Sequence, residues 1–435
     1  MSGTSKPTRI VLLGGGYVSV LAYQGLAKRL KRELNQGQVE LVVIAPESQH
    51  VFHGWTNEVL GGIIPVPHYL TPLRPLMKHA RFVCGWALAV DLQKQTVQVS
   101  LSGPGGHQEQ IAYHHLLIGT GSYDREQGLP GVHEHAWGLK QMGSIMALRN
   151  HLLEVLEQAD SISNIKERER LLSVVVAGGG FSGVEICATI AELLEVARNH
   201  YPTLHTQKVR LVLAHSGETL LPEYLPQFKG LTEYAERQLK AYGVDVRFKT
   251  KLVSVSPEGA QLSDGSFVPS PTVISTVGQT LTALPGTAAL MRSDDFRIIT
   301  DEYLRVQGHE NVWASGDVAS VIHPRSKRPC PANALWAIKH GERVGDNIAR
   351  AVQSQKLLPF TYPGLGQAAS LGVGKGAVEL YGIPFTGWVG WLMRLGFFLM
   401  FMPSRIQMLR VIFNWLTLPL FGRHFVQLNE PERAK

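Results

Sequence analysis

The chain has 435 residues, enough for two or three domains and a large buried core. Apolar residues make up 44% and charged residues 18%, as in a globular protein. The net charge of +7 comes without the long Lys/Arg runs of nucleic-acid-binding proteins, so no nucleic-acid partner is expected. The three cysteines stand far apart, with no C-x-x-C pair and no metal-type spacing, so we expect neither a disulfide framework nor a metal site.

The chain enters a predicted strand almost at once, because "RIVLL" at residues 9–13 is an apolar, β-rich run. We therefore expect no secretory signal peptide and folding in a reducing, cytosolic compartment. A glycine cluster and a helical pattern follow, with Gly14, Gly16 and Ser19 at the positions of a G-x-G-x-x-G motif. In this motif, backbone N–H groups and the helix dipole face the pyrophosphate of a dinucleotide. The segment predicts a first dinucleotide-binding turn.

A dinucleotide-binding domain usually ends its second strand with an acidic residue that binds the adenosine ribose. In "VELVVIAPESQH" the expected position holds Ala45, and Glu47 stands two residues further on. Glu47 can take this role if the end of the strand is shifted, so it is a candidate cofactor ligand. Further along, "HHLLIGTGSYD" at residues 114–124 is a strand that leads into a turn containing Gly121.

The stretch "LLSVVVAGGGFSGVEICATIAELL", residues 171–194, repeats the pattern of the N-terminus. Gly178, Gly180 and Gly183 complete the G-x-G-x-x-G motif between a buried strand and an apolar-periodic helix. One such motif is weak evidence, because glycine clusters also make ordinary turns. Two copies in the same strand–turn–helix context predict two dinucleotide sites.

The C-terminal part contains three informative segments. "ENVWASGDVAS" at residues 310–320 is a strand ending in Gly316 and Asp317, and "PANALWAIKHGERVGDNIARAV" is a helix after it. From Leu380 to Asn429 there is no Asp or Glu, whereas Arg394, Arg405, Arg410 and Arg423 are present.

Two helices are expected in this acid-free tail. The first, "FTGWVGWLMRLGFFLMFMP", contains an arginine and three glycines and is a poor membrane-spanning segment. In the second, polar and apolar residues fall on two faces: Gln407, Arg410, Asn414 and Thr417 on one, and Met408, Val411, Ile412 and Trp415 on the other. This composition predicts amphipathic helices lying on an anionic membrane surface. The alternative is a helical pair packed on a dimer partner or on the chain's own core.

Together, the two glycine turns, the "GTGS" turn and the "WASGD" element resemble the flavoprotein family of two-dinucleotide-domain pyridine nucleotide oxidoreductases. With the tail "LTLPLFGRHFVQL", the chain resembles bacterial type II NADH dehydrogenases over nearly its whole length. The resemblance implies that the first turn, Gly121, Gly316 and Asp317 hold FAD, and that the second turn holds NADH or NADPH. It also implies a homodimer at the cytoplasmic face of the inner (plasma) membrane. Hydride would pass from NAD(P)H to FAD, and electrons would pass to a membrane quinone without proton pumping.

The expected fold is α/β, with two Rossmann-like dinucleotide-binding domains and C-terminal amphipathic membrane-binding helices. An FAD domain of residues 1–130 and 285–350 would contain the NAD(P)H domain, residues 135–282, as an insertion. The membrane-anchoring tail would cover residues 380–435.

Several positions bear on the chemistry that the resemblance implies. His215 stands where NAD-preferring relatives carry a glutamate, which leaves the choice between NADH and NADPH open. Ala334 and Leu335 align with an Ala-Gln pair at the quinone side, and Leu335 cannot donate an amide hydrogen bond to a quinone carbonyl. Lys339 is a further candidate on that side.

Glu185 admits two interpretations. It matches a family glutamate close to nicotinamide and flavin that assists proton delivery to the quinone. Ser182-x-x-Glu185 is equally a helix capping box, in which the carboxylate has no catalytic role.

Three functional hypotheses follow from these patterns. The first is an FAD-dependent NAD(P)H:quinone oxidoreductase. The second is a flavin-bearing membrane subunit that binds a partner and has lost efficient turnover, which Ala45, His215 and Leu335 motivate. The third is a flavoprotein reductase with a protein acceptor.

Overall fold

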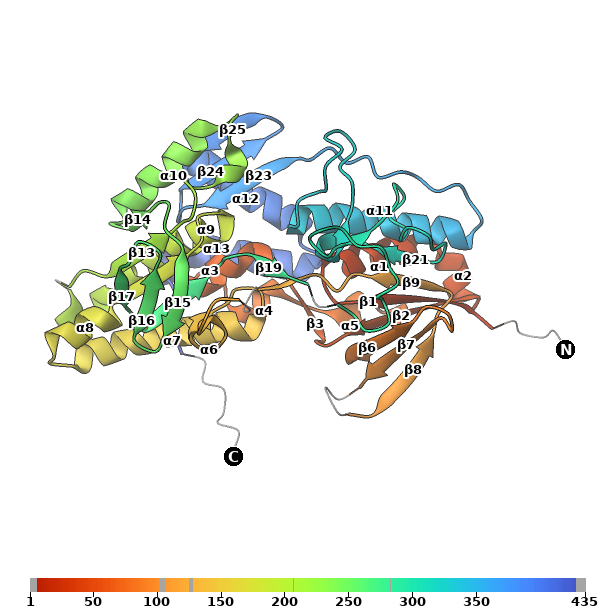
Figure 1. Ribbon diagram of the computed structural model, residues 1–435, viewed down its shortest axis with the longest axis horizontal. Coiled ribbons are helices and arrows are strands. Elements are labelled where there is room, and N and C mark those ends of the chain that lie inside the picture. Colours follow the sequence, from red (N-terminus) through yellow and green to blue (C-terminus); the bar gives the residue numbers. More distant parts are fainter. Residues whose placement is uncertain (1–5, 102–105, 125–127, 206, 282, 428–435) are drawn as a thin grey trace. The chain divides into compact units, whose positions relative to one another are not determined.

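The computed structural model describes residues 6–101, 106–124, 128–205, 207–281 and 283–427. The chain divides by its contacts into two units, which are described separately (Figure 1). The first comprises residues 1–52, 70–123 and 280–364, and the second comprises residues 53–69, 124–279 and 365–435. The ends of the expected domains at residues 1, 282 and 435 lie outside the described residues.

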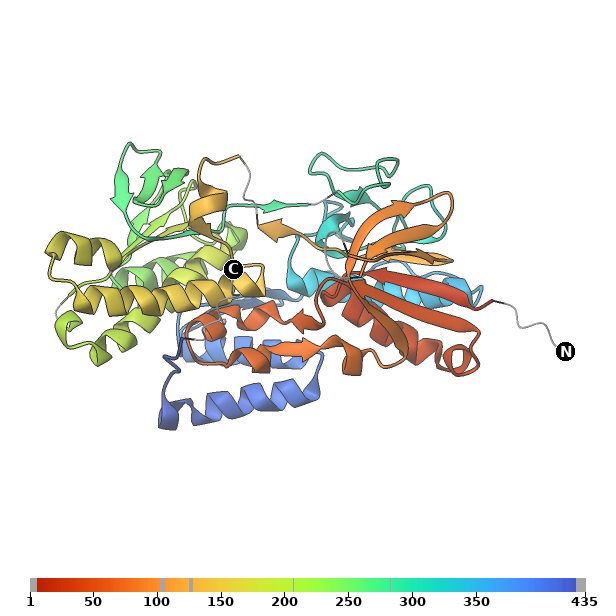
Figure 2. The ribbon, with the colours of Figure 1, turned by 90° about the horizontal axis from the view of Figure 1, so that it is seen from below.

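The first unit is built on a five-stranded parallel sheet in the order β21-β9-β1-β2-β5. Its strands are β1 (Thr8–Leu13), β2 (Val39–Ala45), β5 (Ala80–Cys84), β9 (His115–Ile118) and β21 (Val312–Ala314). Helices α1 (Tyr17–Arg29) and α11 (Ala334–Val352) pack together on one face, and the antiparallel strands β6 (Trp86–Asp91), β7 (Thr96–Ser100) and β8 (Gln108–Ala112) lie on the other (Figures 1 and 2). Smaller elements complete the unit: α2 (Lys31–Asn35), β3 (Gln49–Val51), β4 (Leu70–Pro72), α5 (Leu73–Leu76), β20 (Ile298–Ile299) and β22 (Ala319–Ser320).

The central strand of this sheet explains its apolar sequence. Ile10, Val11, Leu12 and Leu13 of β1 are all fully buried, with no alternation along the strand. A parallel strand covered on both faces reads as a continuous hydrophobic run, as "IVLL" does. The parallel register, with Leu13 opposite both Ile44 and Ile118, brings the carboxyl ends of neighbouring strands to one edge of the sheet.

The second unit contains a parallel sheet in the order β11-β18-β12-β13-β14. Its strands are β11 (Ala136–Trp137), β12 (Ser173–Ala177), β13 (Arg210–Ala214), β14 (Asp245–Arg247) and β18 (Thr272–Ser275). Val174 and Val176 face a core formed with α7 (Met142–Ser161), α9 (Phe181–Ala197) and α10 (Lys229–Ala241). Val175 and Ala177 face the antiparallel strands β15 (Leu252–Ser256), β16 (Gly259–Leu262) and β17 (Phe267–Pro269). Both units thus have the α/β architecture expected for Rossmann-like cores.

The C-terminal segment packs within the second unit. Beside α6 (Val132–His135) and α8 (Ile165–Leu171), the unit contains α3 (Thr56–Leu60), α4 (Val66–Tyr69), the antiparallel strands β23 (Gly366–Ser370), β24 (Gly376–Leu380) and β25 (Ile383–Thr386), and helices α12 (Gly387–Phe401) and α13 (Arg405–Phe421). Among the described residues, no helix is long and apolar enough to cross a membrane.

Helix α13 shows a different pattern of exposure from the expected pair of faces. Gln407, on the expected polar face, is buried and donates to the carbonyl of Pro67, and Asn414 lies 2.6 Å from the ring of His68. The exposed stripe is apolar and follows steps of three and four residues: Ile406, Leu409, Phe413, Leu416 and Leu420. On the expected polar face, Gln407 and Asn414 thus point toward α4, with which both side chains form hydrogen bonds, as in the alternative of a helical pair packed on the chain's own core.

Two of the four tail arginines are also not on the surface. Arg394 is 1% exposed and pairs with carboxylates inside the unit, and Arg423 pairs with Glu192 of α9. Arg394 and Arg423 therefore do not contribute to a cationic membrane-facing surface, contrary to the expectation from the composition of the tail. Arg405 and Arg410, in contrast, are exposed.

The segment after α13 is held by a buried arginine. Arg149 of α7 donates hydrogen bonds to the carbonyls of His424 at 2.5 Å and Val426 at 2.7 Å. The backbone N–H of His424 also donates to the carbonyl of Gly62, and Phe425 packs on the core.

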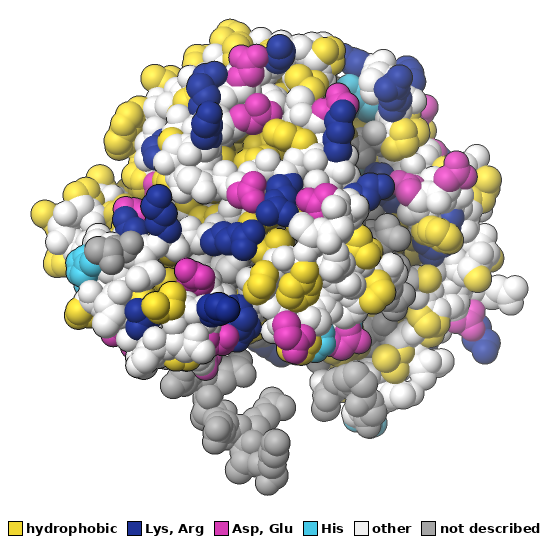
Figure 3. Space-filling view, turned by 60° about the vertical axis from the view of Figure 1, so that its left-hand side comes forward, with side chains coloured by type: hydrophobic (Ala, Val, Ile, Leu, Met, Phe, Trp, Pro, Cys, Tyr) yellow, Lys and Arg dark blue, Asp and Glu magenta, His cyan; other side chains and the backbone are white. Residues whose placement is uncertain are grey.

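On the side of the molecule drawn in Figure 3, basic and acidic side chains are interspersed.

Replacing Arg149 by Met should release residues 422–427. The change removes two charge-assisted hydrogen bonds, so we expect the local free energy of opening to fall by about 2 kcal/mol. Hydrogen exchange followed by mass spectrometry should show faster exchange in that segment and unchanged exchange in β12. Arg210→Met, at an exposed arginine of the same unit, is the control. Equal protection of residues 422–427 in both variants would contradict the role of Arg149.

Candidate functional site

The first glycine turn follows β1 at the carboxyl edge of the sheet. Gly14 has φ of 106°, a conformation that glycine adopts without strain, and its N–H donates to the carbonyl of Ile44. Gly16 precedes α1 with no side chain capping the helix, and a Cβ built on it meets nothing within 4 Å. The N-terminus of α1 therefore offers open space and backbone N–H groups, as a pyrophosphate site requires.

Ser19 occupies the third position of this motif. It is fully buried, and its hydroxyl donates to the carbonyl of Leu13 at 3.3 Å. The serine thus satisfies its own polar group within the turn and leaves the packing of α1 on the sheet intact.

Neighbouring strands bring further predicted residues to the same edge. Gly121 follows β9, and Gly316 and Asp317 follow β21. The hydroxyl of Ser122 donates to Asp317 at 2.6 Å, which links the two loops. The structure therefore collects Gly14, Gly121 and Asp317 around one edge, from segments far apart in the sequence.

Two buried histidines support these loops, and sequence reasoning missed His50. The Nδ1 of His50 lies 3.1 Å from the carbonyl of Gly15, so in this contact the ring donates. The Nδ1 of His340 accepts the N–H of Gly316 at 3.4 Å, and burial lowers the pKa of His340 to about 3. Both rings are therefore hydrogen-bonded to backbone atoms of glycines at this edge, His50 to Gly15 and His340 to Gly316. His50 sits in a short alternating strand, a signal too weak to identify it.

Glu47 lies two residues beyond the end of β2, and Ala45 is the last residue of that strand. The Glu47 side chain is exposed and accepts a long hydrogen bond from Gln49 at 3.4 Å. Its position after the strand keeps it as a candidate ribose ligand.

The second glycine turn follows β12 in the second unit. Gly178 has φ of 116°, and its N–H donates to Ala214, matching the contact of Gly14 with Ile44. A Cβ built on Gly183 would collide with the carbonyl oxygen of Gly178, so this position has no room for a side chain. Gly180 precedes α9 without a side-chain cap. The pattern of strand, glycine turn and uncapped helix start is therefore built twice, although at the second copy the Glu223 carboxylate lies 3.1 Å from a Cβ built on Gly180.

His215, directly after β13, lies against this second turn. Its Nδ1 accepts the N–H of Gly179 at 3.1 Å, and Cβ atoms built on Gly179 and Gly217 would lie within 2.6 Å of its ring. The ring thus lies between two glycines and accepts the hydrogen bond of one N–H group of the turn. The backbone cradle fits a dinucleotide, with His215 at its border.

Glu185 belongs to a buried ionic cluster in the second unit. Its Oε1 accepts the N–H of Ser370 at 2.7 Å and lies 3.3 Å from the guanidinium of Arg394. Arg394 also donates to Glu58 at 2.6 Å. Burial raises the pKa of Glu185; Arg394 opposes the shift, and the neighbouring Glu58 adds to it.

The capping-box interpretation of Glu185 is wrong. Helix α9 begins at Phe181 with Gly180 as its N-cap, and no side chain caps it. The carboxylate instead accepts from Ser370 and from the side chain of Asn57.

Sequence reasoning missed Glu58 as a partner of Glu185. An arginine inside an apolar stretch of 19 residues was the available signal, because a buried guanidinium requires a counter-ion. The sequence separation of Glu58 and Arg394 hid which acid supplies it.

The quinone-side candidates lie in the first turns of α11, in the first unit. Ala334 and Leu335 begin the helix, and Lys339 pairs with Glu342 at 2.9 Å. Asn333 caps the helix by accepting the N–H of Trp336. Leu335 carries no polar group, as the sequence indicated.

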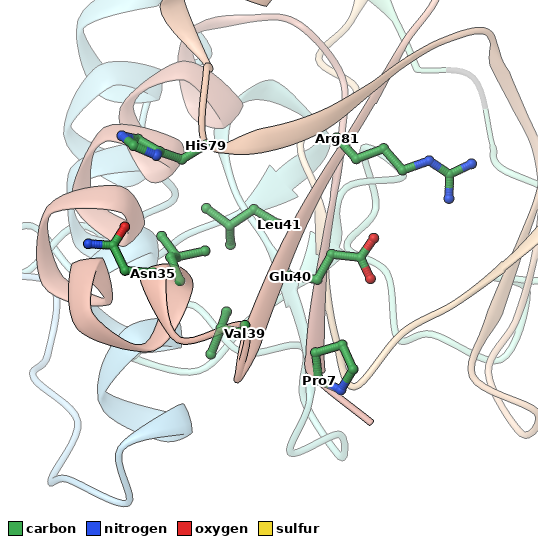
Figure 4. Close-up of a pocket in the computed structure, with 9 residues that line it drawn as sticks. Pro7, Asn35, Val39, Glu40, Leu41, His79 and Arg81 are labelled. Atoms are coloured by element: carbon green, nitrogen blue, oxygen red, sulfur yellow. The ribbon is translucent and has the colours of Figure 1, made fainter. Parts of the chain in front are cut away.

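A hollow of the first unit lies at the opposite edge of its sheet. A cavity of about 290 Å³ is lined by strand-start and loop residues that include Pro7, Val39 and Glu40 (Figure 4). Because β1 begins at Thr8 and β2 begins at Val39, this is the amino end of the strands. It is separate from the glycine turns at the carboxyl end.

One substitution can distinguish the roles of the two glycine turns. Gly183→Ala places a Cβ where the carbonyl of Gly178 lies, so we expect the second turn to distort while the first unit remains unchanged. The purified variant should keep its bound flavin colour but lose bleaching by NADH. Gly230→Ala is the matched control, because a Cβ there meets nothing within 4 Å. Normal bleaching of Gly183→Ala would show that this turn does not bind the donor.

His215→Glu tests the choice of nicotinamide. A carboxylate beside the turn should repel the 2′-phosphate of NADPH, and ~1.4 kcal/mol of repulsion changes a rate ratio about tenfold. We expect the ratio of NADH to NADPH reduction rates, measured by stopped flow, to rise by about that factor. An unchanged ratio would place His215 away from the 2′ position.

Comparisons with known proteins agree with this geometry. The sequence profile of the pyridine nucleotide-disulphide oxidoreductase family matches residues 8–341. A type II NADH:quinone oxidoreductase of Mycobacterium tuberculosis is 26% identical over 95% of this chain and 90% of its own length. A probable NADH dehydrogenase of Dictyostelium discoideum is 24% identical over the same shares. The predicted resemblance to type II NADH dehydrogenases is thus confirmed.

Solved structures agree on the fold. NDH2 from Plasmodium falciparum, solved in complex with NADH, superposes with a TM-score of 0.84 at 14% identity, covering 97% of this chain and 100% of that one. The sulfide:quinone oxidoreductase of Aquifex aeolicus gives a TM-score of 0.69 at 15% identity, covering 96% of each chain. The described cysteines are free, and Cys187 and Cys330 are buried, with pKa values raised to about 12. The chain belongs to the pyridine nucleotide-disulphide oxidoreductase family.

Proposed function

We propose that the protein is an FAD-dependent NADH:quinone oxidoreductase that does not pump protons. The observation that carries the proposal is the duplicated strand–glycine turn–helix site, one in each unit, together with a buried carboxyl group at Glu185. Relatives named type II NADH:quinone oxidoreductase match the chain over most of its length. When bound, FAD would take a hydride from the nicotinamide and supply electrons to the quinone.

The residues of this chain bind and position. In the first unit, the N-terminus of α1 would hold the FAD pyrophosphate, with Gly121, Gly316, Asp317 and the linking Ser122 at the adjoining loops. Glu47 would bind the adenosine ribose. In the second unit, Gly178, Gly180 and Gly183 would hold the nicotinamide dinucleotide at the N-terminus of α9. Glu185, a few residues into that helix, would hold a proton for the quinone.

The acceptor side includes the first turns of α11. Ala334 and Leu335 would contact the quinone ring through apolar surface, with Lys339 nearby on the same helix. The finer preference between NADH and NADPH depends on His215, which accepts the N–H of Gly179 in place of a carboxylate.

Membrane attachment would use the exposed apolar stripe of α13. Exposed large side chains at Ile406, Leu409, Phe413 and Leu416 form one continuous row, and Trp388 extends the apolar surface on α12. Arg405 and Arg410 are exposed on the same helix and suit an anionic lipid surface at the cytoplasmic face. The family resemblance also implies a homodimer.

One alternative is supported by a specific contact. His215 occupies an N–H donor of the second glycine turn, which favours a flavin-bearing membrane subunit without efficient NAD(P)H turnover. In that case the flavin would bind but remain oxidised.

Anaerobic flavin bleaching separates these functions. The protein, purified in mild detergent, is mixed with NADH or NADPH in separate stopped-flow experiments, and a soluble ubiquinone analogue is then added. We expect fast bleaching by one donor and reoxidation by the quinone. A flavin that stays oxidised with both donors would favour the non-catalytic subunit. A reduced flavin that quinone does not reoxidise would favour a protein acceptor.

A further inference from the structure

The buried ionic cluster contains two carboxyl groups and one cation. Arg394, Glu58 and Glu185 are 1%, 4% and 14% exposed in their side chains. The guanidinium of Arg394 contacts one oxygen of each carboxyl group, donates to the carbonyl of Gly54 at 3.3 Å and stacks 4.4 Å from the ring centroid of Phe398. With both carboxyl groups ionised, the cluster would carry an uncompensated buried negative charge.

A small cavity adjoins this cluster within the second unit. It measures about 10 Å³, room for about one water molecule, and its lining comes from α3, α9, α12, α13 and the loop after β23. Glu58 and Trp415 both line it. Each also has a buried polar atom, Oε2 of Glu58 and Nε1 of Trp415, without a hydrogen-bond partner among the described residues.

These two atoms are chemically complementary to a water molecule. The indole N–H can only donate and a carboxylate oxygen can accept, so a water could accept from Trp415 and donate to Glu58. Glu192 and Arg423 form an ion pair at the cavity lining and are 16% and 9% exposed. The lining of the cavity therefore includes a largely buried ion pair beside Glu58 and Trp415.

We propose that Glu58 is the proton partner of Glu185: the two carboxyl groups share one proton across Arg394. The cavity beside Trp415 admits a water molecule that supplies a new proton after the shared proton has left. This inference rests on the proposed function. Reduction of a quinone by NADH consumes one proton from solution, because NADH supplies a hydride and the quinol carries two hydrogens. The proton leaves the Glu185 carboxyl for a quinone oxygen, and water in the cavity returns one through Glu58.

The groups around Glu185 support this assignment of charge. Arg394 on α12 and the N–H of Ser370 on β23 favour the carboxylate, and burial and Glu58 on α3 oppose it. Tyr224 packs in the same core and donates to the carbonyl of Ala377, and its pKa is raised by burial and by Glu185. It therefore remains neutral. Since burial raises the pKa of Glu185, its acid form persists to a higher pH than that of an exposed glutamate.

Infrared difference spectroscopy tests proton sharing without any substrate. At neutral pH, the wild-type protein should show the carbonyl stretch of a buried carboxylic acid. Glu58→Gln should remove that band, because Glu185 then pairs alone with Arg394 and ionises. Glu167→Gln, at a partly exposed glutamate outside the cluster that pairs with Arg170, should leave it. A wild-type protein without the band, or a band that survives in Glu58→Gln, would overturn the proposal.

Kinetics test the proton path. Removing the charge of Glu58 should lower the pKa of Glu185, because Glu58 is one of the groups that raise it. Less of the acid form is then present at neutral pH, so quinone reoxidation should slow in proportion to the loss of the infrared band. The fall in rate with rising pH should begin at a lower pH in Glu58→Gln. Glu167→Gln should keep the wild-type profile. An unchanged profile in Glu58→Gln would overturn the link between the two carboxyl groups.

Trp415→Phe keeps an aromatic ring beside Trp391 and removes the indole N–H together with the five-membered ring that carries it. We expect its single-turnover reoxidation to match wild type, because Glu185 starts protonated. Its steady-state rate should fall, because the reprotonation of Glu185 after each turnover is slowed. Equal steady-state rates would overturn the role of the cavity. If wild-type flavin is not bleached by NADH or reoxidised by quinone, the proposed function fails, whereas the infrared result still decides proton sharing.

Discussion

The placement of Arg394 constrains much of the second unit. A guanidinium with 1% exposure must be compensated, and Glu58 and Glu185 reach it from two other helices. Because α3, α9 and α12 each supply one of these side chains, the C-terminal segment is joined to the helix that begins at the second glycine turn. Removal of Arg394 would leave two buried carboxyl groups without their counter-ion, which is far more costly than loss of a surface pair. The cluster therefore couples the packing of the tail to the position of Glu185.

The glycine turns show how the backbone supplies a binding site before any side chain is considered. In both copies, an N–H at the end of one strand bonds to the next strand, and the following helix begins without a side-chain cap. Cap residues would fill the space that a pyrophosphate needs. Ser19 and Gly183 solve the packing of the third position differently. One bonds its hydroxyl to Leu13, and the other leaves the space empty for the carbonyl of Gly178.

Local patterns in the sequence were sufficient to predict both Rossmann-like cores. Continuous apolar strands, glycine spacing and helical periodicity are short-range signals, and the strands at Thr8–Leu13 and Ser173–Ala177 lie where they were expected. The ionic cluster could not be predicted in the same way. Its members are separated by more than a hundred residues, and S-x-x-E is compatible with either a cap or a distant partner. The inward direction of the polar face of α13 could not be predicted for a related reason, since Gln407 and Asn414 find hydrogen bonds inside the unit.

The contacts that hold residues 423–426 in place have a mechanical consequence. Arg423 pairs with Glu192 on α9, and Arg149 on α7 binds the carbonyls of His424 and Val426. The two C-terminal helices thus form a loop tied at both ends, not a free extension. A force applied to the exposed stripe of α13, such as attachment to a lipid surface, would act on α7 and α9 together. Such a force would therefore reach α9, the helix that begins at the second glycine turn, through the contacts of residues 423–426.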